Sequence, residues 1–142
     1  IVCLYAKHFL YETDKTWSDA GPGFLSIDVP QLHTRIGIGI CMDINPYEYI
    51  DYELYEFANF HKQRNTQLLI LLANWLDNGS HNPRQTNHYW FSRLKPLWGT
   101  KCRFVTCNRI GAERGSQFIG GSCVIDLEKK ALKSALDFEE GL

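Results

Sequence analysis

One cysteine in this sequence occupies a position suited to nucleophilic chemistry. Cys41 ends the β-rich run RIGIGIC, and the polar residues Asp43 and Asn45 follow at once. A thiolate presented to a cleft at the end of a strand can attack a carbonyl or nitrile carbon, and the backbone N–H of Met42 would be placed to receive the developing oxyanion. The plain alternative is that Cys41 is a small buried hydrophobe, as most cysteines in strands are.

Lys7 is the second candidate for chemistry, because it is the first charged residue after the mostly apolar run IVCLYA. An ammonium fixed beside a thiolate lowers the pKa of the cysteine and stabilises tetrahedral intermediates. The alternative is a lysine that simply enters solvent at a strand end. The glycines at 37 and 39 would permit tight packing beside the strand that carries Cys41.

Three further residues are candidates for binding a substrate. Asn74 and Trp75 directly follow the apolar run LLILLA and are placed to line a pocket floor, although Trp75 could equally be a core aromatic. Asp43 lies two residues beyond Cys41 and offers a carboxylate to a cationic substrate group. The alternative role of Asp43 is to cap the turn that follows the strand.

The elements that would position these residues alternate between strands and helices. This alternation predicts a single α/β domain over residues 1–142, with a sheet and crossover helices. Apolar spacing of three and four residues predicts each helix, and short apolar or β-branched runs predict the strands. The expected strands are 1–6, 35–41, 68–73 (covered on both faces), 103–107 and 121–126; the expected helices are about 49–64, with Ile50, Leu54, Phe57 and Ala58 inward, and one opened by Pro83, with Trp90, Leu94 and Leu97 inward.

Polar residues follow three of these strands at the point where each ends. In α/β sheets, functional groups gather at the carboxyl ends of the strands. We therefore expect Cys41, the pair Asn74 and Trp75, and the pair Asn108 and Arg109 to lie on one rim of the sheet.

The composition excludes several classes of function. The formal net charge of −1 gives no basic field that would attract nucleic acid, and the longest apolar run is far shorter than the roughly 20 residues that cross a membrane. Five cysteines without a CxxC, and five histidines without HExxH, argue against a disulfide framework and a zinc site. We expect a reducing, cytoplasmic location, with the nucleus and mitochondria left open.

Five segments resemble the nitrilase superfamily of carbon–nitrogen hydrolases in their order and style, from about residue 5 to 126. They are YAKHFLYETDKTW, RIGIGICMDINPY, LLILLANWL, WFSRLKPLW and NRIGAERGSQFIGGSCVID. CMDINPY and TDKTW are most similar to the fungal branch that deamidates Asn and Gln at protein amino termini.

The resemblance implies an αββα sandwich and a Glu–Lys–Cys triad without metal or organic cofactor. Lys7 and Cys41 match the family's lysine and nucleophile, whereas the glutamate would lie upstream of residue 1. Many relatives carry a supporting glutamate after the lysine. The nearest match here is Lys15, and Glu12 or Asp14 is an alternative for that role.

The implied activity is hydrolysis of a carboxamide to a carboxylate and ammonia, with N-terminal Asn or Gln of proteins as the substrate. The sequence begins with Ile1 and its only methionine is Met42, so we expect part of a longer parent. The resemblance implies that this parent forms a dimer through its sheet, and we expect the isolated chain, which lacks part of the sheet, to be inactive. The rival interpretations are a hydrolase of small amides or carbamoyl compounds, a truncated copy acting as an interaction module, and, less favoured, a Cys–His protease.

Overall fold

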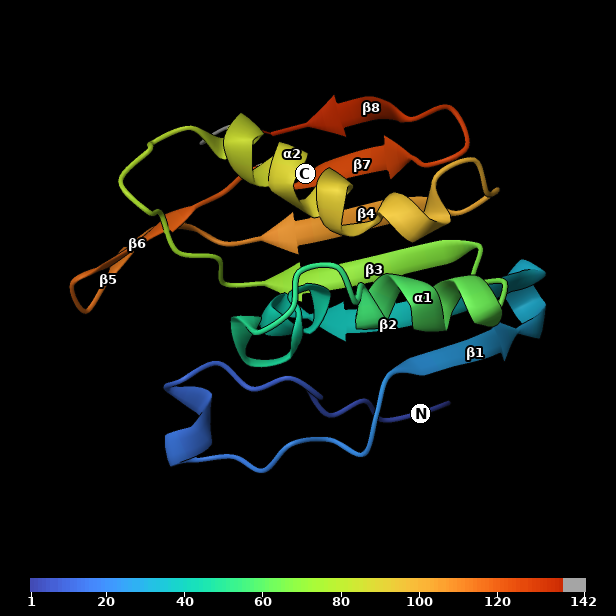
Figure 1. Ribbon diagram of the computed structural model, residues 1–142, viewed down its shortest axis with the longest axis horizontal. Coiled ribbons are helices and arrows are strands. Elements are labelled where there is room, and N and C mark those ends of the chain that lie inside the picture. The colour runs from blue at the N-terminus through green and yellow to red at the C-terminus, as the bar shows by residue number, and fades with distance from the viewer. Residues whose placement is uncertain (137–142) are drawn as a thin grey trace.

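The computed structural model describes residues 1–136, whose centre is a six-stranded sheet with the order β1-β2-β3-β4-β7-β8 (Figure 1). The three central strands β2, β3 and β4 are parallel, and the outer strands are antiparallel to their neighbours. A separate hairpin joins β5 to β6. The strands are β1 Leu25–Val29, β2 Thr34–Ile40, β3 Leu68–Ala73, β4 Arg103–Asn108, β5 Ile110–Glu113, β6 Ser116–Ile119, β7 Cys123–Asp126 and β8 Ala131–Ala135.

Two helices connect the parallel strands, and both lie on the same face of the sheet (Figure 1). The helix α1, Glu56–Gln63, links β2 to β3, and α2, Pro83–Arg93, links β3 to β4. This strand–helix alternation confirms the α/β class predicted from the sequence. Residues 1–136 also contain five short 3-10 turns: Asp14–Thr16, Pro30–Leu32, Cys41–Ile44, Tyr47–Tyr49 and Lys95–Leu97.

The core lies between the sheet and the two helices. Leu69, Leu71 and Phe104 project from the strands, and Phe57 and Trp90 from the helices, each at most 1% exposed. Leu94 and Leu97 were predicted to complete the inner stripe of the second helix; they are equally buried, but they lie beyond its end at Arg93, in the C-cap and the following 3-10 turn.

Glycines let the first helix approach β2 closely. A Cβ at Gly39 would lie 2.5 Å from the Phe57 ring, and one at Gly37 would lie 2.4 Å from the His61 ring. These distances are shorter than real Cβ contacts, so the tight packing expected at both glycines is present. The strand that ends at Cys41 is thereby pressed against α1.

The opposite face of the sheet is less covered than the sequence suggested. We expected β3 to be buried on both faces, but Leu72 is 50% exposed, whereas Leu69 and Leu71 have no exposure. The reason is that both helices lie on one face, and residues 1–136 place no second layer on the other (Figure 1). The described residues thus form one sheet and one helix layer of the expected sandwich.

Residues 1–6 were predicted as a strand and do not form one. They have no pairing partner among residues 1–136, and Ile1, Val2 and Leu4 are more than 80% exposed. The apolar run resembles a strand in composition, but a strand also requires a neighbour to accept its backbone hydrogen bonds.

The first helix is shorter than predicted. It begins at Glu56, because Tyr49 and Tyr55 have left-handed backbone angles, with φ of 59° and 49°, that an α-helix does not accommodate. Ile50 and Leu54 are consequently exposed by 76% and 51% instead of facing the core. Phe57 and Ala58, also predicted to face inward, are buried.

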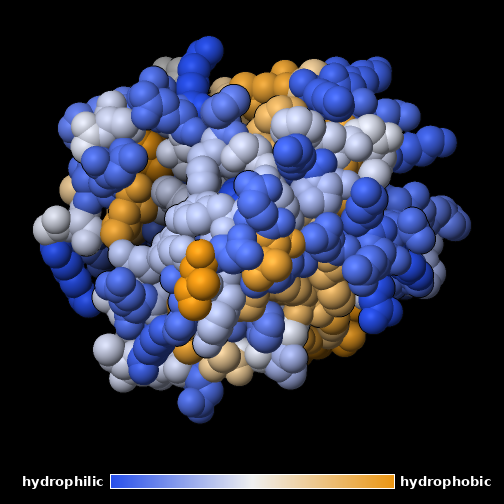
Figure 2. Space-filling model, in the orientation of Figure 1, coloured by the Kyte–Doolittle hydropathy of each residue, from blue (hydrophilic) through white to orange (hydrophobic). Residues whose placement is uncertain are grey.

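The surface over the helices is mainly hydrophilic, with separate apolar patches (Figure 2). No helix within residues 1–136 combines the length and apolar character needed to cross a bilayer.

Candidate active site

Cys41 stands at the sharp turn where β2 ends. It is the first residue of the 3-10 turn Cys41–Ile44 and has a φ of 46°, in the left-handed region that L side chains rarely adopt. Such a conformation costs roughly 1–2 kcal/mol and persists only where the surroundings impose it. The turn projects the thiol from the carboxyl end of the strand into open space.

A large cavity lies at this rim of the sheet, with a volume of about 860 Å³. Its walls include Cys41, Asn74, Asn108 and Arg109, so the three strand ends expected to share a rim do so. Lys7 reaches the same cavity from the amino-terminal segment, although residues 1–6 are not a strand. The structure therefore brings together both residues expected to carry chemistry.

A second, smaller cavity of about 150 Å³ also borders Cys41. Tyr11, Tyr49, Met42 and Trp75 contribute to its walls. Cys41 lines both cavities and so stands at their junction. A group attached to a larger molecule could enter the small cavity while the rest of that molecule occupies the large one.

The Lys7 ammonium forms an ion pair with Asp14. Both side chains are largely shielded, at 15% and 19% exposure, and Asp14 also accepts the backbone N–H of Tyr11 at 3.0 Å. Of the alternatives Glu12 and Asp14, it is Asp14 that contacts the lysine. Lys15 instead pairs with the exposed Glu48 at 2.7 Å.

The thiol of Cys41 experiences opposing influences on its pKa. Burial raises the pKa, and the nearby Lys7 ammonium and a backbone hydrogen bond from Asn74 lower it. The carboxylates of Asp14 and Asp43 add to the rise, and the net direction is upward. The thiol is therefore protonated at neutral pH, and its activation requires a base that removes the proton.

The backbone N–H of Asn74 is a functional group that the sequence did not reveal. Its hydrogen bond to Cys41 stabilises negative charge on the sulfur. Because a backbone amide has the same chemistry in every residue, the only available signal was the position of Asn74 after a predicted strand. The Asn74 side chain was predicted to bind substrate; it lies on the walls of both cavities.

Asp43 was expected to offer its carboxylate to a cationic substrate, and this expectation is wrong. The side chain has 0% exposure and accepts four hydrogen bonds. A carboxylate that is enclosed and fully hydrogen-bonded has no site left for a ligand. The alternative role, capping the turn, agrees better with the structure, because the carboxylate accepts the backbone N–H of Ile40. Its other three hydrogen-bond donors lie outside the turn.

Trp75 combines the two roles considered for it. Its ring lies on the wall of the small cavity and packs edge-on against buried Trp90, with centroids 5.5 Å apart. Its backbone N–H donates to Oδ1 of Asn108 at 2.8 Å. Asn108, which is 5% exposed, thus fixes the loop that carries Asn74 and Trp75.

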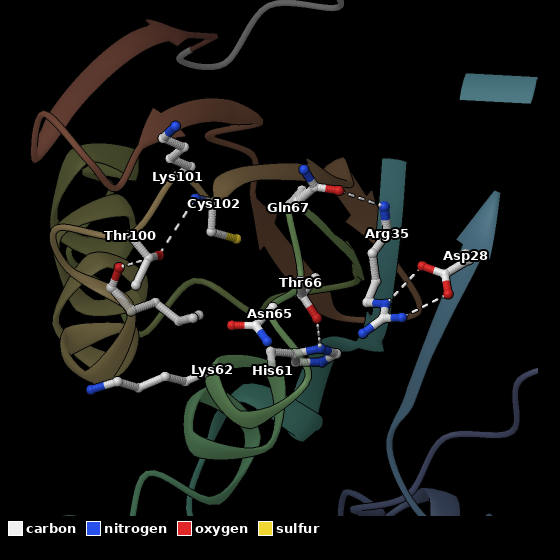
Figure 3. Close-up of a pocket in the computed structure, with 11 residues that line it drawn as sticks. Asp28, Arg35, His61, Lys62, Asn65, Thr66, Gln67, Thr100, Lys101 and Cys102 are labelled. Atoms are coloured by element: carbon white, nitrogen blue, oxygen red, sulfur yellow. Dashed lines mark hydrogen bonds and ion pairs between the residues drawn. The ribbon is translucent and has the colours of Figure 1, made fainter. Parts of the chain in front are cut away.

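A third cavity, of about 500 Å³, lies at the opposite end of the sheet (Figure 3). Two of its charged side chains form an ion pair, in which Arg35 donates to Asp28 at 2.6 Å. The cysteine in its wall, Cys102, is 1% exposed, and burial raises the pKa of the Cys102 thiol to about 12. Lys62 and Lys101 also line this cavity, but neither ammonium lowers the pKa of the buried Cys102 thiol, unlike Lys7 at the Cys41 site. Within residues 1–136, no cluster of His, Cys, Asp or Glu side chains is arranged to hold a metal ion.

Solved structures with this arrangement of strands and helices include an amidase and an NAD+ synthetase. The NitN amidase from Nesterenkonia sp. AN1 superposes with a TM-score of 0.75 at 18% identity, over 99% of this chain and 49% of that one. The chain has the nitrilase-type fold. A glutamine-dependent NAD+ synthetase from Acinetobacter baumannii superposes with a TM-score of 0.80 at 18% identity, over 99% of this chain and 25% of that one.

Curated sequences similar to this nitrilase-type chain are named protein N-terminal amidase. The Schizosaccharomyces pombe protein is 35% identical over 147 residues, which covers 89% of this chain and 51% of that protein. The Saccharomyces cerevisiae protein is 28% identical over 102 residues, covering 59% of this chain and 22% of that protein. No family model matches the sequence. The chain thus spans about half the length of the first of these relatives.

Proposed function

We propose that this nitrilase-type chain supplies the nucleophile and lysine of an amidohydrolase that deamidates N-terminal Asn or Gln of proteins. The observation that carries the proposal is the shared cavity of Cys41 and Lys7, in which the ammonium lowers the pKa of the thiol. The name of the relatives, protein N-terminal amidase, supports the substrate.

The reaction would begin with removal of the Cys41 proton, which the raised pKa of the thiol makes necessary. The resemblance assigns this step to a glutamate outside the chain. The thiolate attacks the carboxamide carbon, and Lys7 with the Met42 and Asn74 amides would stabilise the oxyanion. Ammonia leaves with the proton taken from the thiol, and water then hydrolyses the thioester to the carboxylate.

Recognition of a protein amino terminus requires a partner for its α-ammonium. The large cavity contains two carboxylates, and Asp14 is already paired with Lys7. Asp19, on the same cavity wall, forms no ion pair among residues 1–136. We assign Asp19 the role that the sequence had suggested for Asp43.

Hydrolysis of small amides is the second candidate, supported by the small cavity of about 150 Å³ beside Cys41. A free amide would need only this cavity, whereas a peptide would also occupy the larger one. One of the solved relatives is described as a complex of the Nesterenkonia amidase with butyramide.

The decisive assay compares three substrates: a peptide that begins with Asn, the same peptide with an acetylated amino terminus, and butyramide. The assay uses two proteins: the chain alone, and a longer protein that also contains any residues encoded upstream of residue 1. The proposal predicts ammonia release and an Asp product from the free peptide only. Faster turnover of butyramide than of the peptide would favour the second candidate instead.

The Cys41→Ala variant is the control for the chemistry. Loss of a nucleophile typically lowers kcat by about 10⁴–10⁶-fold. Undiminished deamidation by this variant would refute the role of Cys41 whichever substrate is preferred. If neither form of the wild-type protein releases ammonia from any substrate, the interaction-module interpretation replaces the enzyme.

A further inference from the structure

The carboxylate of Asp43 connects the two segments that carry Lys7 and Cys41. Its Oδ1 accepts the backbone N–H groups of His8 and Phe9, at 3.0 and 2.8 Å. Its Oδ2 accepts the hydroxyl of Tyr5 at 2.8 Å and the backbone N–H of Ile40 at 2.8 Å. Three donors thus flank Lys7 along the chain, and the fourth directly precedes Cys41.

No other hydrogen bond within residues 1–136 joins residues 1–10 to residues 40–45. Just beyond residues 40–45, the Phe9 ring also contacts the Tyr47 ring, with centroids 5.3 Å apart. Because residues 1–6 are not held in the sheet, the Asp43 carboxylate supplies the hydrogen-bonded link between the segment of Lys7 and the turn of Cys41. The Gly21 N–H donates to the Lys7 carbonyl at 2.8 Å, and Phe9 packs edge-on against Phe24, so this segment is also tied to the loop that follows it.

We propose that Asp43 is a positioning residue whose carboxylate holds the Lys7 ammonium against the Cys41 thiol. The proposal rests on the function proposed above. It assigns the completely buried carboxylate a task that explains its four donors, since a buried charge without partners would be strongly unfavourable. Asp43 itself touches no substrate, because its side chain is enclosed.

The positioning role and a direct electrostatic effect predict opposite changes at Cys41. The Asp43 charge itself raises the pKa of the thiol, whereas the Lys7 ammonium lowers it. Direct loss of the charge in Asp43→Asn would therefore lower the thiol pKa. If the Lys7 ammonium instead moves away from Cys41 in this variant, the thiol pKa would rise, even though the substitution removes a negative charge.

The experiment measures the rate of Cys41 alkylation by acrylamide against pH in the full chain, with peptide mapping to resolve each cysteine. A solved variant of the Nesterenkonia amidase carries an acrylamide adduct on its active-site cysteine. The variants are Asp43→Asn, Lys7→Met and the double variant. Asp126→Asn is the matched control, because Asp126 is 8% exposed, accepts a backbone N–H from Lys129 and lies at the other end of the sheet.

We expect Asp43→Asn to raise the apparent pKa of Cys41 by half a unit or more, which slows alkylation at pH 7 about threefold. Lys7→Met should raise it as well, and the double variant should not exceed Lys7→Met, because both changes remove one interaction. Asp126→Asn should leave the profile unchanged. An unchanged or lowered pKa in Asp43→Asn, while Lys7→Met raises it, overturns the positioning role alone.

If the pH profile of Cys41 alkylation is unchanged in Lys7→Met, the ammonium does not influence the thiol. That result would contradict the proposed function as well as the positioning role. If Asp43→Asn does not fold, judged by circular dichroism, Tyr5→Phe decides the question. That variant retains the carboxylate and its three backbone donors and removes only the hydrogen bond from the Tyr5 hydroxyl. A smaller rise of the Cys41 pKa in Tyr5→Phe supports positioning, and no rise contradicts it.

Discussion

The ammonium of Lys7 is paired with the carboxylate of Asp14, and both groups act on the pKa of Cys41. The pair is mostly shielded from solvent, unlike the exposed pair of Lys15 and Glu48 one residue further along the chain. A supporting carboxylate is therefore present beside the lysine, one position before the residue that the resemblance indicated.

Replacement of Asp14 by Asn should lower kcat/KM for the Asn-initiated peptide by up to about 10²-fold, because misplacement of a catalytic group by roughly 1 Å has this effect. Lys15→Met is the matched control and should change kcat/KM little, since its pair with Glu48 is exposed. The measurement is steady-state kinetics of both variants. Equal losses in the two variants would show that Asp14 has no special role.

Removal of the carboxylate at position 19 should raise KM for peptides. In Asp19→Asn we expect about a tenfold rise for the Asn-initiated peptide, which corresponds to 1.4 kcal/mol, since an ion pair to the α-ammonium is lost. Butyramide has no ammonium, so its KM should not change. An equal rise for both substrates would indicate a general disturbance of the cavity.

Addition of one methyl group at position 39 should destabilise the fold. In Gly39→Ala the new Cβ would meet the Phe57 ring at 2.5 Å, and overpacking of this kind costs about 1–3 kcal/mol. Urea unfolding of the chain measures the loss. A second change, Phe57→Leu, should restore part of it by making room; an additive further loss would contradict the steric explanation.

The buried histidine in α1 should make the fold sensitive to acid. Burial lowers the pKa of His61 to about 3, whereas the unfolded value is about 6.5. Between these values the unfolded chain binds a proton that the folded chain does not, so stability falls as the pH falls from 6.5 toward 3. The contribution of His61 is fully present above pH 6.5.

The variant His61→Gln removes this titration. Between pH 7 and pH 5 we expect the wild-type chain to lose about 2 kcal/mol more of its unfolding free energy than the variant. Urea unfolding at the two pH values gives the comparison. Parallel losses in both proteins would show that His61 is not the group that titrates.

The central strands, and the edge of the sheet where Cys41, Asn74 and Asn108 lie, could be predicted because they depend on local sequence patterns. LLILLA and RIGIGIC are β-rich runs with polar residues directly after them, and a parallel arrangement brings such strand ends together. The helix opened by Pro83 was also predictable, since Asn82 and Pro83 form a standard helix start and the apolar stripe that follows is regular.

Other features depend on contacts between distant parts of the chain and could not be predicted from local patterns. The strands β1, β5, β6 and β8 are short, and much of their surface is exposed, so their composition gives a weak signal. The partners of Asp43 lie more than 30 residues away in sequence, apart from the nearby Ile40. In the sequence, Asp43 was predicted to bind substrate only because it lies near Cys41. In the fold, its carboxylate is enclosed and cannot reach a substrate.

Trapping the acyl group on the enzyme identifies the nucleophile directly. The protein that releases ammonia from the Asn-initiated peptide would be mixed with this peptide, quenched in acid and digested, and the modified peptide would be identified by mass spectrometry. The proposed function predicts a thioester on Cys41 that is absent in Cys41→Ala. An acyl group on any other residue, with Cys41 unmodified, would contradict it.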